Sequence, residues 1–140
     1  KIDNKFVIQS DVQSLSSAQV NGMSVGGGQI ELVAPPGSGY IVQPLLITCI
    51  CTYVSSGNSG GYLYVSNQAG QTGNYLVAQR DFYKLETADR TFMFGAAGTA
   101  LADGTYDGTI DNLGLYAYSN TPFTGDWTMK IITTYQIVKI

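Results

Sequence analysis

The C-terminal segment of the chain alternates between two kinds of side chain. Every second position is mostly apolar or aromatic, and the positions between them are mostly polar. The first set is Trp127, Met129, Ile131, Thr133, Tyr135 and Ile137, and the second is Thr128, Lys130, Ile132, Thr134 and Gln136. Successive side chains of a β-strand point to opposite faces of a sheet, whereas helical side chains share a face at every third or fourth position. The pattern therefore predicts a half-buried β-strand at the end of the chain.

A second long β-like run, residues 40–54, is largely apolar on both of its alternating faces. A sandwich strand in a monomer has one face in water, so the second apolar face predicts a further layer or another subunit as its cover. Pro44 has no N–H to donate and marks a sheet edge or a bulge. The candidate subunit-interface residues in this run are Leu45, Leu46, Ile47 and Ile50.

Shorter strand patterns occur at residues 5–9, 30–34, 62–65, 75–78, 91–94 and 112–118, with Gly-, Asn- or Pro-containing turns between them. About eight short strands with regular turns are typical of an antiparallel β-sandwich of the jelly-roll type. We expect one all-β domain over residues 1–140, in which residues 1–28 form an N-terminal arm with a short strand and residues 29–140 form the sandwich. Residues 10–28 are expected to be mostly irregular, with at most a short helix at residues 11–15, capped by Asp11.

Composition narrows the function classes. Charged residues make up 12% of the chain, the net charge is −3, and there are only 7 Lys and Arg residues. A nucleic-acid-binding domain of this size normally carries a basic patch, so no nucleic acid is expected as a partner. The sequence also has no uninterrupted apolar stretch of the roughly 18 residues that a membrane-spanning helix needs, so no membrane insertion is expected.

Histidine is absent from the chain, which excludes Ser-His-Asp and Cys-His catalysis and a histidine general base. We expect no enzymatic activity and no cofactor. The candidate calcium ligands are Asp103, Asp107 and Asp111, which recur every four residues. Their spacing is not that of an EF-hand, and Asp-Gly is also an ordinary turn dipeptide, which is the interpretation we favour.

Cys49 and Cys51 lie two positions apart in the 40–54 run and are the chain's 2 cysteines. On a strand they would point to the same face, and they are too close in sequence for an unstrained disulfide. We expect two buried, reduced thiols that pack as small apolar side chains. Reduced thiols fit assembly in a reducing cytoplasm.

The chain contains 10 Tyr residues and 1 Trp. Tyrosine is a favoured strand residue, and its amphipathic ring is also common at binding surfaces. Three tyrosines in or beside loops are candidate ligand contacts for a glycan: Tyr75, Tyr106 and Tyr118. Trp127 is a fourth aromatic residue beside a loop, and we expect it to anchor the core instead.

Two turns and the strands that flank them resemble jelly-roll modules of phage virion proteins, found in head fibres, tail fibres and receptor-binding tips. The first turn, residues 34–39, joins a short strand to a long apolar strand. The second, residues 121–126, precedes the closing strand at residues 131–138. The chain differs from these modules at Pro36, where a Gly-compatible position is usual, and in its second cysteine.

The resemblance implies a non-enzymatic virion structural protein, either a fibre head used in host attachment or a capsid-surface decoration. It implies a homotrimer that contacts other virion proteins, assembled in the host cytoplasm, with a host surface glycan as a further partner. The alternative from a different class is a monomeric secreted carbohydrate-binding module. Oligomeric state and thiol state separate the two, because a secreted module would more often carry disulfides.

Overall fold

The computed structural model describes residues 7–24, 27–58, 60–67, 76–81, 87–95 and 111–140. These residues form eight strands and one short helix. In chain order they are β1 (Gln9–Leu15), α1 (Ser17–Gly22), β2 (Ile30–Val33), β3 (Tyr40–Tyr53), β4 (Tyr62–Ser66), β5 (Leu76–Asp81), β6 (Arg90–Gly95), β7 (Leu115–Ser119) and β8 (Trp127–Lys139). The all-β prediction is therefore confirmed.

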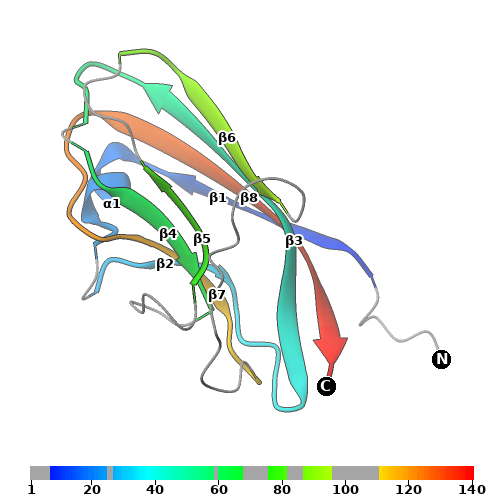
Figure 1. Ribbon diagram of the computed structural model, residues 1–140. Helices are drawn as coiled ribbons and strands as arrows, with labels where there is room; N and C mark the ends of the chain where they lie inside the picture. Colours follow the sequence, from blue (N-terminus) through cyan, green and yellow to red (C-terminus); the bar gives the residue numbers. More distant parts are fainter. Residues whose placement is uncertain (1–6, 25–26, 59, 68–75, 82–86, 96–110) are drawn as a thin grey trace.

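The strands form two sheets that face one another (Figure 1). Sheet A has the strand order β1-β8-β3-β6 and sheet B the order β2-β7-β4-β5. All pairings between neighbouring strands of each sheet are antiparallel. Strands that follow one another in sequence mostly lie in opposite sheets, which is the arrangement of an eight-stranded jelly roll. The predicted fold class is confirmed.

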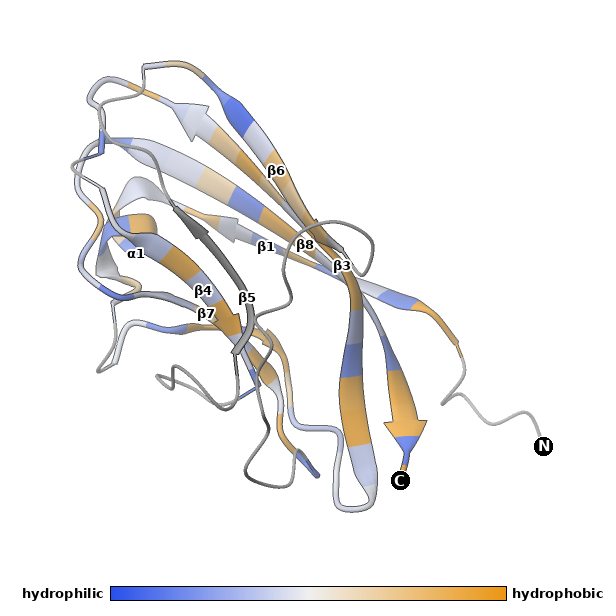
Figure 2. Cartoon of the chain, in the orientation of Figure 1, coloured by the Kyte–Doolittle hydropathy of each residue, from blue (hydrophilic) through white to orange (hydrophobic). Residues whose placement is uncertain are grey.

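The core fills the space between the two sheets. Figure 2 shows apolar and polar bands alternating along β3 and β8, as period-two burial requires. Sheet A contributes Val42, Ile47, Cys49, Cys51, Phe94, Trp127, Met129, Ile131 and Tyr135, and sheet B contributes Leu32, Val33, Leu63, Val65, Leu115 and Ala117. The apolar set predicted for the C-terminal strand thus points inward, with Ile137 partly buried at its end.

A β-bulge in β3 changes the face to which its alternating side chains point. Pro44 pairs with Tyr135 and Leu46 pairs with the next residue, Thr134, so Leu45 is an extra residue without a partner in β8. As a result Val42, at an even position, and Ile47, at an odd position, both point into the core. The apolar character of both alternating sets is partly explained by this shift. Of the two features that Pro44 predicted, a sheet edge or a bulge, the structure has the bulge.

The N-terminal region is more ordered than predicted. The first described strand is β1, which pairs along its whole length with β8, rather than a strand at residues 5–9. The helix lies after this strand instead of at residues 11–15. Ser16 caps it, because Ser16 Oγ accepts from the N–H of Gln19 and Gln19 Oε1 accepts from the N–H of Ser16. Asp11 therefore lies in a strand and caps nothing.

The turn before β8 ties three segments together. Asp126 accepts hydrogen bonds from Ser17 of α1 and from Ser55, which follows β3. These two bonds hold the pKa of the Asp126 carboxyl below its usual value, the Ser17 bond being the stronger cause. Gly125 has φ +88°, and a Cβ there would lie 2.5 Å from the carbonyl oxygen of Gly57. This close approach requires a glycine at this position of the turn.

Candidate functional site

The outer face of sheet A carries a continuous row of outward-pointing side chains across all four strands. By register, Val12 of β1 lies opposite Ile132 of β8, Ile132 lies opposite Thr48 of β3, and Thr48 lies opposite Met93 of β6. Val12 is 54% exposed and Met93 is 60% exposed. Two apolar side chains at the sheet edges and one near its centre therefore face solvent in a single row.

Two rows flank this one and extend its apolar character. In one row Leu46 lies opposite Thr134, whose hydroxyl is 3.0 Å from that of Ser10. In the other, Ile50 lies opposite Lys130. Leu46 and Ile50 are 38% and 37% exposed. Apolar side chains on β3 are thus within reach of Met93 on β6, while hydroxyl groups cover much of the remaining face.

Formal charge is nearly absent from this face. Among the outward-pointing residues that the structure describes on the four strands, Lys130 is the charged one. Charged side chains normally cover the solvent-exposed face of a sheet and keep it from associating. A broad face of hydroxyl and apolar groups instead resembles in composition the centre of a protein interface, where charge is depleted.

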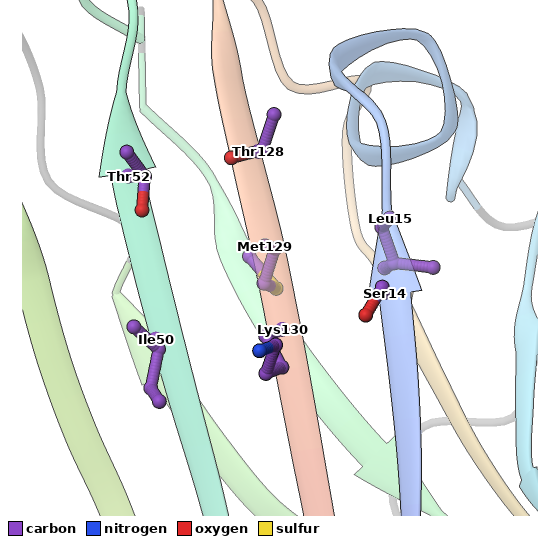
Figure 3. A pocket seen from close by; sticks show the side chains of 7 residues that line it. All are labelled: Ser14, Leu15, Ile50, Thr52, Thr128, Met129 and Lys130. Atoms are coloured by element: carbon purple, nitrogen blue, oxygen red, sulfur yellow. The ribbon is translucent and has the colours of Figure 1, made fainter.

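A small open depression of about 200 Å³ lies on this face between β1, β8 and β3. Figure 3 shows Ile50, Lys130 and Ser14 side by side on the three strands, with Thr52 and Thr128 in the neighbouring row. The depression contains one amine and three hydroxyl groups but neither a carboxylate nor a thiolate in its lining. Its mixed polar and apolar lining suits a contact surface.

The structure divides the four predicted interface residues between two environments. Leu46 and Ile50 point outward, and Leu45 is half-buried at the bulge. Ile47 is only 1% exposed and belongs to the core, so its placement among surface contacts was wrong. The candidates were drawn from both faces of the strand, because both are apolar. Ile47 shares the face of Cys49 and Cys51, which the structure places in the core. Met93 and Val12, which were not predicted, belong to the exposed row.

The predicted ligand-contact tyrosines are not gathered into a site by the described residues. Tyr118 is fully buried, and its ring stacks on Tyr64 with 5.5 Å between centroids. Because the ring is covered, the prediction of a direct ligand contact by Tyr118 was wrong. The same burial raises its pKa to about 12. Tyr75 and Tyr106 lie outside the described residues. Tyr62 and Tyr64 were missed, although the Tyr-Leu-Tyr alternation at 62–64 already places both on one face.

Trp127 lies in the core, as predicted. It is 2% exposed, and its ring meets that of Tyr53 edge-on with 5.4 Å between centroids and 72° between planes. This geometry is one that aromatic pairs favour in protein interiors. Trp127 is therefore an anchor of the sandwich and not a ligand platform.

Asp111 has a structural role in the turn between β2 and β3. Its Oδ1 accepts from the N–H of Gly39, and Oδ1 of the adjacent Asn112 accepts from the N–H of Gly37, both at 2.7 Å. Asp103 and Asp107 lie outside the described residues, so the calcium hypothesis is not tested there. Within the described ranges no three carboxylate, thiol or imidazole side chains come together as a metal site.

The two cysteines are free and buried in the core on one face of β3. Cys49 lies opposite Ile131 and Cys51 opposite Met129. Burial raises the pKa of both thiols, that of Cys51 to about 12, and the neighbouring Cys51 raises the pKa of Cys49 further. Both are therefore protonated and unreactive near neutral pH.

No protein-family model and no curated protein matches the chain. Among solved structures, it is similar to a chain of a full particle of Israeli acute paralysis virus, with 13% identity over 96% of this chain and 73% of that chain and a TM-score of 0.37. It is also similar to a chain of the native virion of Kashmir bee virus, with 13% identity, coverages of 94% and 72% and a TM-score of 0.38. A CBM4 chain has 14% identity, coverages of 92% and 94% and a TM-score of 0.35.

These similarities carry no argument about function, because all three TM-scores lie below 0.5. The jelly-roll assignment rests instead on the strand order of the two sheets. Among the described residues, no helix is both long and apolar enough to cross a membrane.

Proposed function

We propose that the chain is a non-enzymatic structural protein of a virion, a fibre head or capsid-surface protein used in host attachment, and that it assembles as a homotrimer. The observation that carries the proposal is the outer face of sheet A. Val12, Leu46, Ile50 and Met93 are all exposed there, and a soluble protein seldom leaves such a group of apolar side chains in water. A second copy of the chain is the simplest cover for this face.

The interface is centred on β3 and β6 and not on β1. Leu46 and Met93 lie there in neighbouring rows, and these two rows hold apolar and hydroxyl groups but no charge. Lys130 lies one strand away, where it can remain at the rim of the contact and keep its water. Burying its amine without a partner would cost several kcal/mol, on the order of 3–5.

Three-fold assembly and a place in the virion follow from the resemblance to phage virion modules. Other virion proteins are the expected partners, and the buried thiols Cys49 and Cys51 are compatible with assembly in a host cytoplasm. The absence of histidine from the sequence supports a binding role over a catalytic one. The competing function, a monomeric secreted carbohydrate-binding module, differs most sharply in its oligomeric state.

Light scattering after size-exclusion chromatography at micromolar concentration tests the proposal. We expect a trimer for the unmodified chain. Leu46→Asp and Met93→Asp place a carboxylate at the centre of the interface and should dissociate the trimer or make the protein insoluble. Val54→Asp is the matched control, because Val54 is 53% exposed but lies beyond the end of β3.

The control variant should remain trimeric. A stable monomer for the unmodified chain, with both interface variants folded and soluble, would exclude the proposed assembly. The monomeric carbohydrate-binding module would then be the better description.

A further inference from the structure

A stack of tyrosine rings lies on the outer face of sheet B. Tyr64 of β4 lies opposite Tyr118 of β7, and their ring centroids are 5.5 Å apart with 29° between planes. Tyr64 also stacks with Tyr62, two positions earlier on the same strand, at 6.1 Å and 27°. Leu63, between the two β4 tyrosines, points into the core. The three rings therefore form one row on the face opposite to the core.

Exposure rises steadily along this row. Tyr118 is fully buried, Tyr64 is half-buried, and Tyr62 is 41% exposed. Burial also raises the pKa of Tyr64, in agreement with its position inside the stack. The stack thus begins at a closed end and terminates at Tyr62, whose ring is open to solvent.

The backbone of Tyr62 is held firmly by Asn120, at the end of β7. The N–H of Tyr62 donates to Asn120 Oδ1 at 2.8 Å, and the N–H of Asn120 donates to the carbonyl oxygen of Tyr62 at 3.3 Å. With its backbone paired and one ring contact provided by Tyr64, the Tyr62 ring has little freedom left to lose. Such rigid tyrosines bind ligands at a low entropy cost.

Polar groups lie beside the backbone of Tyr62. Because Asn120 Oδ1 is occupied by the N–H of Tyr62, the Nδ2 group of the same amide remains to donate to a ligand. Thr121 follows it and is exposed, and its Oγ1 lies 3.0 Å from the position of a Cβ on Gly61, next to Tyr62 in sequence. Gly61 has φ +122°, and the lack of a side chain there leaves the hydroxyl accessible.

We propose that Tyr62, Asn120 and Thr121 form a binding site for a neutral sugar residue. A pyranose has a flat face of C–H groups and a rim of hydroxyls. The C–H face would stack on the open face of Tyr62, and the sugar hydroxyls would form hydrogen bonds with the amide of Asn120 and the hydroxyl of Thr121. Single-stranded nucleic acid also stacks on tyrosine, but it needs cationic groups along its backbone, and the chain has a net charge of −3. The site is independent of the face proposed for assembly.

The test is binding to an array of neutral mono- and oligosaccharides that end in glucose, galactose, mannose or N-acetylglucosamine, with oligo-dT as a further probe. Affinities come from ligand-observed NMR titration. Contact with one sugar gives a dissociation constant on the order of 1 mM, so the sugars are used at up to about 10 mM. We expect Tyr62→Ala to weaken binding about tenfold and Tyr62→Phe, which keeps the ring, to bind within about threefold of the unmodified chain.

Asn120→Asp tests the polar part of the site most directly. Its carboxylate can still accept from the N–H of Tyr62, but the Nδ2 donor is lost. It should weaken binding while leaving the melting temperature nearly unchanged. Val54→Ala is the control, since that exposed side chain lies outside the site. It should bind sugar as the unmodified chain does.

Three outcomes would overturn the proposal: no sugar of the panel binds, sugar binding is unaffected by Tyr62→Ala, or oligo-dT binds in place of sugars. Light scattering on the same samples separates this proposal from the assembly proposal. A monomer that binds sugar through Tyr62 contradicts the trimer alone, and a trimer that binds no sugar contradicts the sugar site alone.

Discussion

Cys49 and Cys51 show how a single strand can bury two thiols without joining them. Both side chains point to the same face of β3 and are fully buried, with Cys49 opposite Ile131 and Cys51 opposite Met129 on β8. Two neighbouring same-face cysteines of an extended strand do not reach disulfide geometry without distortion of the backbone. They therefore act as core side chains whose acidity is suppressed by burial.

We predict that neither thiol reacts with a maleimide on the native protein within minutes, and that both react at once in about 6 M guanidinium chloride. A thiol with a pKa raised to about 12, as for Cys51, is almost wholly protonated at neutral pH and is also sterically covered. Mass spectrometry counts the labels. Two rapid labels on the native protein would contradict the burial of this strand, and zero labels on the unfolded, unreduced protein would indicate a disulfide.

The bulge at Leu45 is the feature of greatest consequence at the scale of elements. β3 pairs with β8 on both sides of it, and the extra residue lets Val42 and Ile47 share the inward face. The described pairing of β3 with β6 runs from Leu46 to Cys51, so the bulge lies one position before it. A bulge bends its strand and increases the local twist.

Deleting Leu45 should leave the fold intact. Pro44 and Leu46 would then become consecutive and would still pair with Tyr135 and Thr134, so the ladder would only become regular. The free energy of unfolding should decrease by on the order of 1–2 kcal/mol, because the packing of one half-buried leucine is lost.

Deletion of Thr48 is the contrasting change, because that residue lies in a regular part of the same strand. It would turn Ile47 and Val42 outward or pull the following half of the strand out of register, at about 1.5–3 kcal/mol for each side chain exposed. Urea denaturation measures both variants. Equal destabilisation by the two deletions would contradict the bulge.

At the scale of the whole molecule, both sheets contain buried side chains with raised pKa values. Tyr135 donates to Asp11 at 2.9 Å, and burial followed by this carboxylate raises its pKa to about 12. Tyr118 reaches a similar value through burial. Together with the two thiols, these groups keep their protons in the native state well above the pH at which an unfolded chain releases them.

Stability should therefore fall as the pH rises from about 9 to about 12. In this window the unfolded chain, with thiols and phenols near their ordinary pKa of 9.0 and 10.0, binds fewer protons than the native state, so the free energy of unfolding decreases with pH. Below about pH 9 the stabilisation that these thiols and phenols contribute is fully present. Urea midpoints at about pH 8 and about pH 11 measure the effect.

Tyr135→Phe removes one of these titrating groups, and its midpoint should decrease less between the two pH values than that of the unmodified chain. A midpoint that does not change with pH, or one that decreases equally in the variant, would contradict the assignment of the raised pKa to Tyr135.

What the sequence by itself determined is local. The alternation at residues 127–137 predicted both a strand and its inward set, because side-chain direction along a strand depends only on position within it. The buried thiols and the core position of Trp127 followed in the same way. The number of strands followed from the turns between them.

Only the tertiary structure decided what depends on partners far away in the chain. The bulge at Leu45 exists because of pairing with Tyr135 and Thr134, about ninety positions later, and alternation within residues 40–54 could not reveal it. Whether a tyrosine is open or covered is likewise a property of its neighbours across the sheet, which is why Tyr118 was placed at the surface and Tyr62 was missed. The chain specifies the direction of each side chain locally, but its exposure arises from contacts between segments remote in sequence.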